Sequence, residues 1–374
     1  MKLSTRAVHA GRDDLVDLGL HAVPIDLSTT YPSRDSHGET ARLDLAAAGE
    51  ALSGSQVYGR VGNPTVARFE AALAELEGCA AAVAFASGMA ALSACLLAAV
   101  TAGRPHVVGV RPLYGTTDHV LETGLLGTTV TWATADKVES ALRNDTGLVI
   151  VESPANPTLE EHDLGAIAAA CGDVPLLVDN TFATPIRQRP VESGARIVMH
   201  SATKFLGGHG DVLAGVIACD EPYARVLRQI RFATGAVLHP LAGYLLLRGL
   251  STLPIRVRAA SATAATLAAR LATHPAVAKV HYPGGPLVSV EIHGDPHQVI
   301  SAVRLLTPAV SLGSVDSLIQ IPAALTHRVM GADSRADSGI SDRLIRISIG
   351  LEDVEDLWQD LNQALSVSHR VGDS

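Results

Sequence analysis

A lysine and an aspartate follow two apolar segments that are expected to be neighbouring β-strands. Asp179 comes directly after residues 176–178, and residues 197–199 lead through the sequence HSAT to Lys204. A lysine at a strand end can form a Schiff base with an aldehyde, and burial or a nearby cation lowers its pKa and makes the amine nucleophilic. A carboxylate on the adjacent strand can keep a pyridine nitrogen protonated. Together the two residues predict an enzyme that uses pyridoxal 5'-phosphate (PLP).

Either residue alone has an ordinary explanation, since Asp179 can cap a turn and Lys204 can be an exposed lysine before a glycine turn. A third strand end favours the functional interpretation. Asn156 comes shortly after the apolar residues 148–151, at the carboxyl end where open α/β sheets bind ligands. Its amide can hydrogen-bond the phenolic oxygen of the cofactor.

A fourth strand end fits a phosphate. Gly88 and Met89 follow the apolar residues 80–86 and open a helical segment, whose free N–H groups and positive dipole end suit an anion. Ser201 and Thr203 can add hydroxyl groups to the same phosphate. The preceding serine can also be a simple helix cap, but four such elements in one order predict a cofactor site.

The chain resembles the Cys/Met-metabolism family of PLP enzymes nearly from end to end. This family includes cystathionine γ-synthases, cystathionine γ-lyases and methionine γ-lyases, and the methionine γ-lyase branch is the most similar. The motifs that carry the resemblance are AVHAG (7–11), YGRVGNPT (58–65), LYGTT (113–117), VDNTFATP (178–185), HSATKFLGGHGDVLAG (200–215), TGAVLHP (234–240), VSLGSVDSLIQIPAALTH (310–327) and RISIGLEDVEDL (346–357).

The resemblance implies a role for each residue that matches a family motif. Lys204, Tyr114 and Asp179 would be catalytic, with Lys204 carrying the cofactor and Tyr114 stacking on its ring. The residues that bind the cofactor would be Tyr58, Arg60, Gly88, Met89, Tyr114, Asn156, Asp179, Thr181, Ser201, Thr203 and Lys204. Tyr58 and Arg60 would come from a neighbouring subunit. Val310, Ser311 and Arg346 would bind the substrate, and no metal is expected.

Arg346 is expected to bind the α-carboxylate of the substrate, because a planar guanidinium matches a carboxylate bidentately. It could instead be a surface arginine on a strand. Its neighbours Leu344, Ile345, Ile347 and Ile349 indicate a buried strand, where an unpaired arginine would be costly.

The elements that position these residues indicate an α/β protein. Short apolar segments alternate with helical patterns between residues 57 and 244, which predicts a mostly parallel sheet covered by helices. A helix is expected at 241–271, followed by strands at 277–281, 288–292 and 344–349. The resemblance implies PLP-dependent transferase fold type I, with a seven-stranded sheet and helices on both faces.

The length of 374 residues predicts more than one domain. We expect an N-terminal arm over residues 1–56, a PLP-binding α/β domain over 57–244 and a smaller α+β domain over 245–374. In this family the arm contacts a partner subunit, and the expected assembly is a homotetramer with shared active sites. Relatives usually have some twenty more residues after the YPG at 282–284, so this chain is expected to lack a surface segment there.

Composition excludes several other classes. The net charge of −9, without basic clusters, argues against nucleic acid as a partner. The four cysteines, Cys79, Cys95, Cys171 and Cys219, show no zinc spacing and are expected to be reduced thiols in the core. Residues 1–14 have no apolar core of a signal peptide, which predicts the cytoplasm.

Two other features have competing interpretations. Residues 78–103 contain no charged side chain and are long enough to span a bilayer. They are rich in Ala and Gly, however, and Ser87-Gly88 divides them in two. A buried strand, turn and helix is therefore expected, and no membrane contact. His200, His209 and Asp211 could suggest a metal, but no ligand spacing supports one.

The residue before the SLG motif bears on the reaction. Relatives specialised for cystathionine usually have an acidic residue there, whereas this chain has Val310, which favours a short thioether without a distal charge. The TGAVL segment also resembles the methionine γ-lyases, although Thr116 and Arg231-Phe232 depart from their pattern. The expected reaction is α,γ-elimination of L-methionine or a related thioether. Alternatives are a cystathionine γ-lyase, a γ-replacing synthase or sulfhydrylase, a transaminase and a non-catalytic PLP-binding protein.

Overall fold

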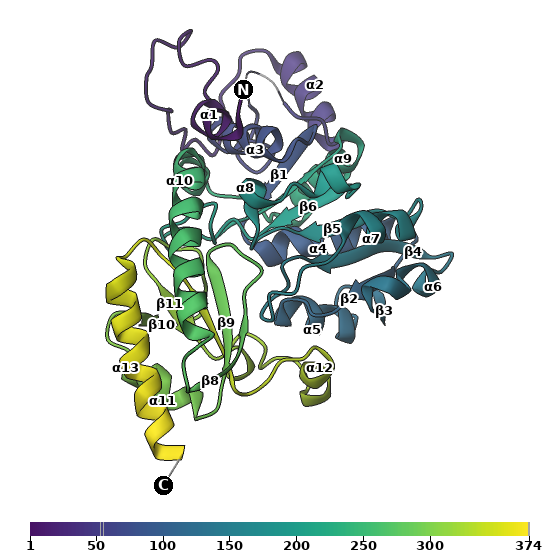
Figure 1. Ribbon diagram of the computed structural model, residues 1–374. Helices are drawn as coiled ribbons and strands as arrows, with labels where there is room; N and C mark the ends of the chain where they lie inside the picture. The colour runs from purple at the N-terminus through teal and green to yellow at the C-terminus, as the bar shows by residue number, and fades with distance from the viewer. Residues whose placement is uncertain (53, 55, 373–374) are drawn as a thin grey trace.

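The computed structural model describes residues 1–52, 54 and 56–372, which contain two β-sheets (Figure 1). The larger sheet has seven strands in the order β1-β7-β6-β5-β4-β2-β3. They are β1 (Ala81–Phe85), β2 (His106–Val110), β3 (Thr129–Ala133), β4 (Thr146–Glu152), β5 (Leu176–Asp179), β6 (Ile197–His200) and β7 (Gly215–Cys219). Strand β7 runs antiparallel to both of its neighbours, and the other pairs are parallel. The predicted seven-stranded, mostly parallel sheet is confirmed.

Helices cover both faces of this sheet, which is why its central strands are apolar on both sides. The helices are α3 (Pro64–Glu77), α4 (Gly88–Thr101), α5 (Gly115–Thr123), α6 (Val138–Ala141), α7 (Leu164–Cys171), α8 (Thr184–Arg187) and α9 (Glu221–Thr234), with short 3-10 turns at Ala135–Lys137 and Pro190–Ser193. In β1, Val83 and Phe85 pack with α4, whereas Ala82 and Ala84 pack with α3 on the opposite face. Residues 78–103 form a strand, turn and helix, as expected.

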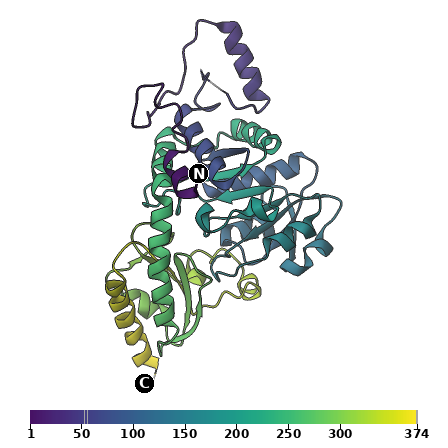
Figure 2. The same ribbon diagram turned by 45° about the horizontal axis from the view of Figure 1, so that its top comes forward.

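Among the residues described before position 57, two helices are present, α1 (Leu3–His9) and α2 (Ser36–Ala47), in the segment that the sequence predicted as an N-terminal arm. Helix α1 packs against α3 and against α10 (Pro240–Leu271). Helix α2 stands away from the sheet in the view of Figure 2. The side chain of Asp35 stabilises its start by accepting a 2.9 Å hydrogen bond from the N–H of Gly38.

Helix α10 connects the two halves of the molecule (Figure 1). It packs on α3 near its start and contacts β9 (Leu287–Ile292) of the second sheet farther along. That sheet has the order β10-β11-β12-β9-β8, with β8 (Val277–His281), β10 (Thr307–Pro308), β11 (Leu318–Gln320) and β12 (Leu344–Ser348). The remaining elements are α11 (Pro296–Ala302), a 3-10 turn at Pro322–Ala324, α12 (Ala332–Asp337) and α13 (Val354–Gly372).

The predicted helix and strands of this half are present, and residues 282–286 join β8 to β9 where the sequence lacks its relatives' extra segment. The domain boundaries at 56 and 244 stay predictions. No helix in the described part of the chain is both long and apolar enough to cross a bilayer.

Candidate active site

A cavity of about 380 Å³ lies at the carboxyl ends of β4 and β5 and reaches Arg346 of the second sheet. It brings together twelve of the predicted site residues: Gly88, Met89, Tyr114, Asn156, Asp179, Thr181, Ser201, Thr203, Lys204, Val310, Ser311 and Arg346. The parallel strands explain this gathering, because their carboxyl ends meet at one edge of the sheet. The two remaining predicted residues, Tyr58 and Arg60, do not line it.

Lys204 lies in the turn after β6, and its Nζ atom donates a hydrogen bond of 2.7 Å to Oγ of Ser311. Burial, together with the charge of Arg346, lowers the pKa of Lys204 to about 8. The fraction of neutral, nucleophilic amine near neutral pH is therefore much larger than in a free lysine. This is the state that Schiff-base chemistry requires.

Close packing holds the turn that contains Lys204. A side-chain carbon at Gly249 would lie 2.3 Å from the carbonyl oxygen of Leu206, so only glycine lets α10 approach this closely. Gly313 has a φ of +81°, and a side-chain carbon there would lie 2.6 Å from the backbone nitrogen of Phe205. Arg256 donates hydrogen bonds to the carbonyls of Phe205 (2.9 Å) and Gly249 (2.7 Å).

Asp179 is oriented by Thr181. Its Oδ1 accepts hydrogen bonds from the backbone N–H (3.0 Å) and the hydroxyl (2.5 Å) of Thr181. Burial raises the pKa of Asp179, and the two bonds from Thr181 oppose that rise. No hydrogen bond to Oδ2 is found within the described residues, which leaves this oxygen free for a donor in the cavity. A protonated pyridine nitrogen is such a donor.

The opposite end of the cavity suits a phosphate. Ser87 caps α4 by accepting a 3.1 Å hydrogen bond from the N–H of Ala90, so the first turn of the helix opens into the cavity at Gly88. A side-chain carbon at Gly88 would lie 3.0 Å from Cβ of Ser201. The hydroxyl of Thr203 already bonds both the carbonyl and the N–H of Ala214, so binding a phosphate requires its proton to turn away from that carbonyl.

Arg346 is only 2% exposed and is held by the two groups beside it. It donates to Oδ1 of Asn156 (2.6 Å) and to the carbonyl of Ser311 (3.0 Å). Burial lowers its pKa to about 10, which still leaves it charged near neutral pH. Its Nε atom is buried without a hydrogen-bond partner among the described residues. An unsatisfied, buried guanidinium N–H at a cavity is suited to a carboxylate ligand.

The cavity is also lined by residues that were not predicted as site residues, among them Glu152 and Phe182, and His327 lies beside it. Glu152 ends β4 directly opposite Asp179 of β5, and that strand-end position was a signal for it. The ring of Phe182 lies 5.7 Å from the Arg346 guanidinium carbon. His327 is buried and contacts Asn156; the sequence offered no signal for it beyond its place in a family motif.

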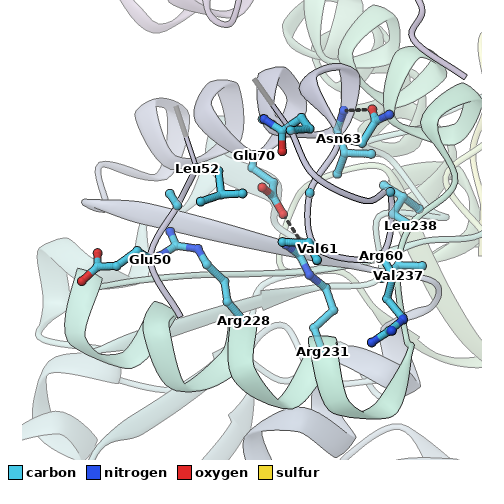
Figure 3. Close-up of a pocket in the computed structure, with 16 residues that line it drawn as sticks. Glu50, Leu52, Arg60, Val61, Asn63, Glu70, Arg228, Arg231, Val237 and Leu238 are labelled. Carbon is cyan, nitrogen blue, oxygen red and sulfur yellow. Dashed lines mark hydrogen bonds and ion pairs between the residues drawn. The ribbon is translucent and has the colours of Figure 1, made fainter. Parts of the chain in front are cut away.

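Tyr58 and Arg60 lie outside the cavity of their own chain. Tyr58 is 45% exposed, and Arg60 donates a 2.9 Å hydrogen bond to the carbonyl of Phe232. Arg60 lines a separate cavity of about 60 Å³ (Figure 3), near an ion pair of 2.6 Å between Arg231 and Glu70. Within one chain these two residues therefore contribute nothing to the larger cavity.

His200 is also placed apart from the cavity. Its Nε2 atom lies 2.5 Å from Oε1 of Glu77, and both side chains are fully buried. Among the described residues, no group of three or more His, Cys, Asp or Glu is arranged to hold a metal ion.

The chain matches the family described as "Cys/Met metabolism PLP-dependent enzyme" over residues 4–366. It belongs to this family. Members of the family use PLP, and the cavity fits that cofactor from end to end. Lys204 would supply the amine, Asp179 would offer a free carboxylate oxygen to the ring nitrogen, and the start of α4 at Gly88 would hold the phosphate.

Individual relatives cover almost the whole chain. It is 70% identical to an "L-methionine gamma-lyase" of Streptomyces avermitilis over 97% of this chain and 89% of the relative. It is 52% identical to an "L-methionine gamma-lyase" of Brevibacterium sandarakinum over 98% of each chain. A solved structure, a cystathionine gamma-lyase of Lactobacillus plantarum complexed with L-serine, superimposes with a TM-score of 0.88 at 32% identity, covering 99% of this chain and all of the other. The PLP-dependent fold type I predicted from the sequence is confirmed.

Proposed function

We propose that the protein is a PLP-dependent carbon–sulfur lyase. It catalyses the α,γ-elimination of L-methionine or a closely related thioether amino acid, with water as co-substrate. The products are a thiol, 2-oxobutanoate and ammonia. The names of the relatives from Streptomyces avermitilis and Brevibacterium sandarakinum support this activity.

The observation that carries the substrate assignment is an apolar outer wall of the cavity. Val310 and Leu213 line the cavity with side chains that are 55% and 71% exposed. Neither can pair with a charge, so a second ammonium group of the substrate would find no partner on this wall. A short, uncharged thioether loses no such interaction and buries apolar surface.

The residues of the chain divide the work between two ends of the substrate. Arg346 binds the α-carboxylate and fixes the Cα–H bond near the amine of Lys204, which removes the Cα proton and moves protons during the later steps. PLP supplies an electron-withdrawing ring that accepts electrons from the substrate carbon. Asp179 holds the proton on the nitrogen of that ring. Tyr114 donates a proton from its hydroxyl to the departing sulfur.

The test is to measure 2-oxobutanoate release by the purified holoenzyme from L-methionine, L-cystathionine and O-acylhomoserines, with and without L-cysteine. We expect methionine to have the highest kcat/KM and cysteine to leave the products unchanged. If the enzyme converts O-succinylhomoserine and cysteine to cystathionine faster than it cleaves methionine, the lyase proposal is wrong and the protein is a γ-replacing synthase.

Cystathionine is the second candidate substrate, favoured by one specific observation. A neighbouring cavity of about 740 Å³ shares Leu213 and Val310 with the first and is also lined by Asp211 and Asp316. These carboxylates could accept the distal ammonium of a longer substrate. The same assay distinguishes this candidate, because cystathionine would then exceed methionine in kcat/KM.

We further propose that each active site is shared between two subunits of a homotetramer. The exposure of Tyr58 and its position outside the cavity, together with Arg60, support this assembly. The chain would divide into an arm (1–56), a PLP-binding domain (57–244) and a smaller domain (245–374). A cytoplasmic location is consistent with four cysteines that form no disulfide.

A further inference from the structure

Glu152 is a buried carboxylate that uses both of its oxygens on the backbone of two site residues. It is 3% exposed and lines the cavity. Its Oε2 accepts a hydrogen bond of 2.7 Å from the N–H of Tyr114, which is 38 positions away in the sequence. Its Oε1 accepts one of 3.1 Å from the N–H of Asn156. One side chain therefore fixes the distance between these two residues.

His327 contacts the same two residues from another element. Its Nε2 atom lies 3.1 Å from the carbonyl oxygen of Asn156, and its ring meets the ring of Tyr114 edge-on, with centroids 6.4 Å apart. Because a carbonyl oxygen only accepts, Nε2 must carry the hydrogen. Burial lowers the pKa of His327 to about 3, so it stays neutral. Asn156 is thus held at its N–H by Glu152 and at its carbonyl by His327.

Glu152 and His327 together form a clamp on the backbone of Asn156. This clamp extends to Arg346, the group that would bind the substrate carboxylate. With the backbone of Asn156 fixed on both sides, its Oδ1 accepts the 2.6 Å hydrogen bond from Arg346. Tyr114 immediately precedes α5, so a fixed backbone N–H also fixes where its ring leaves the chain. Glu152 therefore links the residue expected over the cofactor ring to the expected carboxylate-binding pair.

Electrostatics supports the same connection. Glu152 and Asp179 are directly paired residues of β4 and β5, and both carboxyl groups are buried. Burial, and then the charge of Asp179, raises the pKa of Glu152 well above its usual range, while its two backbone hydrogen bonds and the charge of Arg346 oppose the rise. A carboxyl group in so costly a position is retained where its hydrogen bonds serve a purpose.

We infer that Glu152 is a positioning residue, which holds the ring of Tyr114 and the Asn156–Arg346 pair in one fixed arrangement around the bound cofactor and substrate. The inference rests on the proposed roles of Tyr114 and Arg346. It does not depend on methionine being the substrate, because any α-amino acid presents the same carboxylate.

The test is the Glu152→Gln variant of the holoenzyme. Glutamine keeps the shape, but its –NH₂ group replaces one acceptor and faces a backbone N–H, so one hydrogen bond is lost. Two properties are measured besides activity: the visible circular dichroism of bound PLP, which reports the orientation of the ring, and the affinity for glycine, followed by the visible spectrum. We expect the dichroic signal to change by more than the bound-cofactor content and glycine affinity to fall about 10-fold or more.

Asp360→Asn is the matched control. Asp360 is a buried carboxylate that accepts three backbone hydrogen bonds, from Arg304, Leu305 and Leu306, at 2.8 to 3.0 Å, and it does not line the cavity. This variant should lower thermal stability and leave both optical measurements unchanged. If Glu152→Gln behaves in the same way, Glu152 has only a structural role and the inference is wrong.

A second variant covers the case in which Glu152→Gln fails to fold. His327→Phe keeps a ring beside Tyr114 but removes the hydrogen bond to Asn156, and it should weaken glycine binding through Arg346 while changing the dichroic signal less. Unchanged glycine affinity in this variant would show that the fixed backbone of Asn156 does not govern binding at Arg346, and this would also reject the inference. Glycine has no leaving group, so these results stand apart from the lyase proposal, which is decided by the 2-oxobutanoate assay on the wild-type enzyme.

Discussion

The Nζ atom of Lys204 lies 2.7 Å from Oγ of Ser311, a residue whose backbone has a φ of +101°. Ser311 lies between β10 and β11, so the second sheet supplies the hydroxyl that meets the reactive amine of the first half. A non-glycine residue in this region of φ costs about 1–3 kcal/mol. The chain retains that strain at a position where a side-chain oxygen faces Lys204.

Replacing Ser311 in two ways separates the strain from the hydrogen bond. Ser311→Gly and Ser311→Ala both remove the hydroxyl, but only glycine adopts a positive φ without cost. We expect the glycine variant to be more stable than the alanine variant by about 1–3 kcal/mol in the free energy of unfolding, measured on apoprotein in urea. Both should lose activity. Equal stabilities would show that the backbone at this position is not strained.

The lowered pKa of Lys204 predicts the pH dependence of cofactor binding. Only the neutral amine attacks an aldehyde, so the rate of PLP attachment to apoprotein should rise about tenfold per pH unit below pH 8 and level off above it. A lysine of ordinary pKa would continue to accelerate toward pH 10.5. Stopped-flow absorbance gives the rates, and Lys204→Ala, which should form no borohydride-reducible adduct, is the control.

The same shift affects the stability of the apoprotein. Between pH 8 and 10.5 the unfolded chain holds a proton on Lys204 that the folded chain has lost. The unfolded state therefore binds more protons, and this group makes the free energy of unfolding rise with pH across that window. Below pH 8 the cost of burying the charged amine is fully present. Relative to Lys204→Ala, wild-type apoprotein should gain stability from pH 8 to 10, and a flat difference would contradict the assigned pKa.

Val310 predicts the choice between substrates. Val310→Glu places a carboxylate on the outer wall, where it can pair with the distal ammonium of cystathionine, and we expect the ratio of kcat/KM for cystathionine to that for methionine to rise about tenfold. Val310→Gln has the same size without the charge and should change the ratio much less. A similar rise in both variants would mean that size, not charge, governs the selection.

Shared sites can be tested by mixing inactive subunits. Arg60→Ala and Lys204→Ala proteins should each have little activity, but in a mixed dimer one of the two sites has both residues intact. Unfolding and refolding the two together should restore about one quarter of wild-type activity, since half of the dimers are mixed. A mixture that stays inactive, or a fully active monomer, would show that Arg60 acts within its own chain or not at all.

The sequence predicted the parts of the fold whose hydrophobic pattern is uniform. Strands such as β4 and β6 are buried on both faces, so their sequences contain continuous apolar stretches, at 148–151 and 197–199. Helix α2 was not predicted, because it has one buried residue, Ala46, and no clear apolar face. Its start depends on the hydrogen bond from Gly38 to Asp35 rather than on core packing.

The site residues likewise divide into those that the sequence pattern predicts and those that it does not. Lys204 and Asp179 could be predicted because their chemistry requires strand ends, and strand ends are visible in the sequence. The clamp by Glu152 could not, because its partner Tyr114 is 38 positions away and an acid after an apolar segment usually faces solvent. Whether a carboxylate meets water or two backbone N–H groups is decided only when the chain is folded.

The packed turn around Lys204 has a consequence for how the enzyme can vary. Close packing at Gly249 and Gly313 confines it, and Arg256 donates a hydrogen bond to one of its carbonyls, that of Phe205. The backbone of Lys204 is therefore fixed, and the amine moves only by rotation of its own side chain. Every atom that exchanges a proton with Lys204 must then lie within the arc swept by that side chain. New substrates can be accommodated by reshaping the wall at Val310 and Leu213, whereas the reach of the Lys204 amine is set by the fixed position of its backbone.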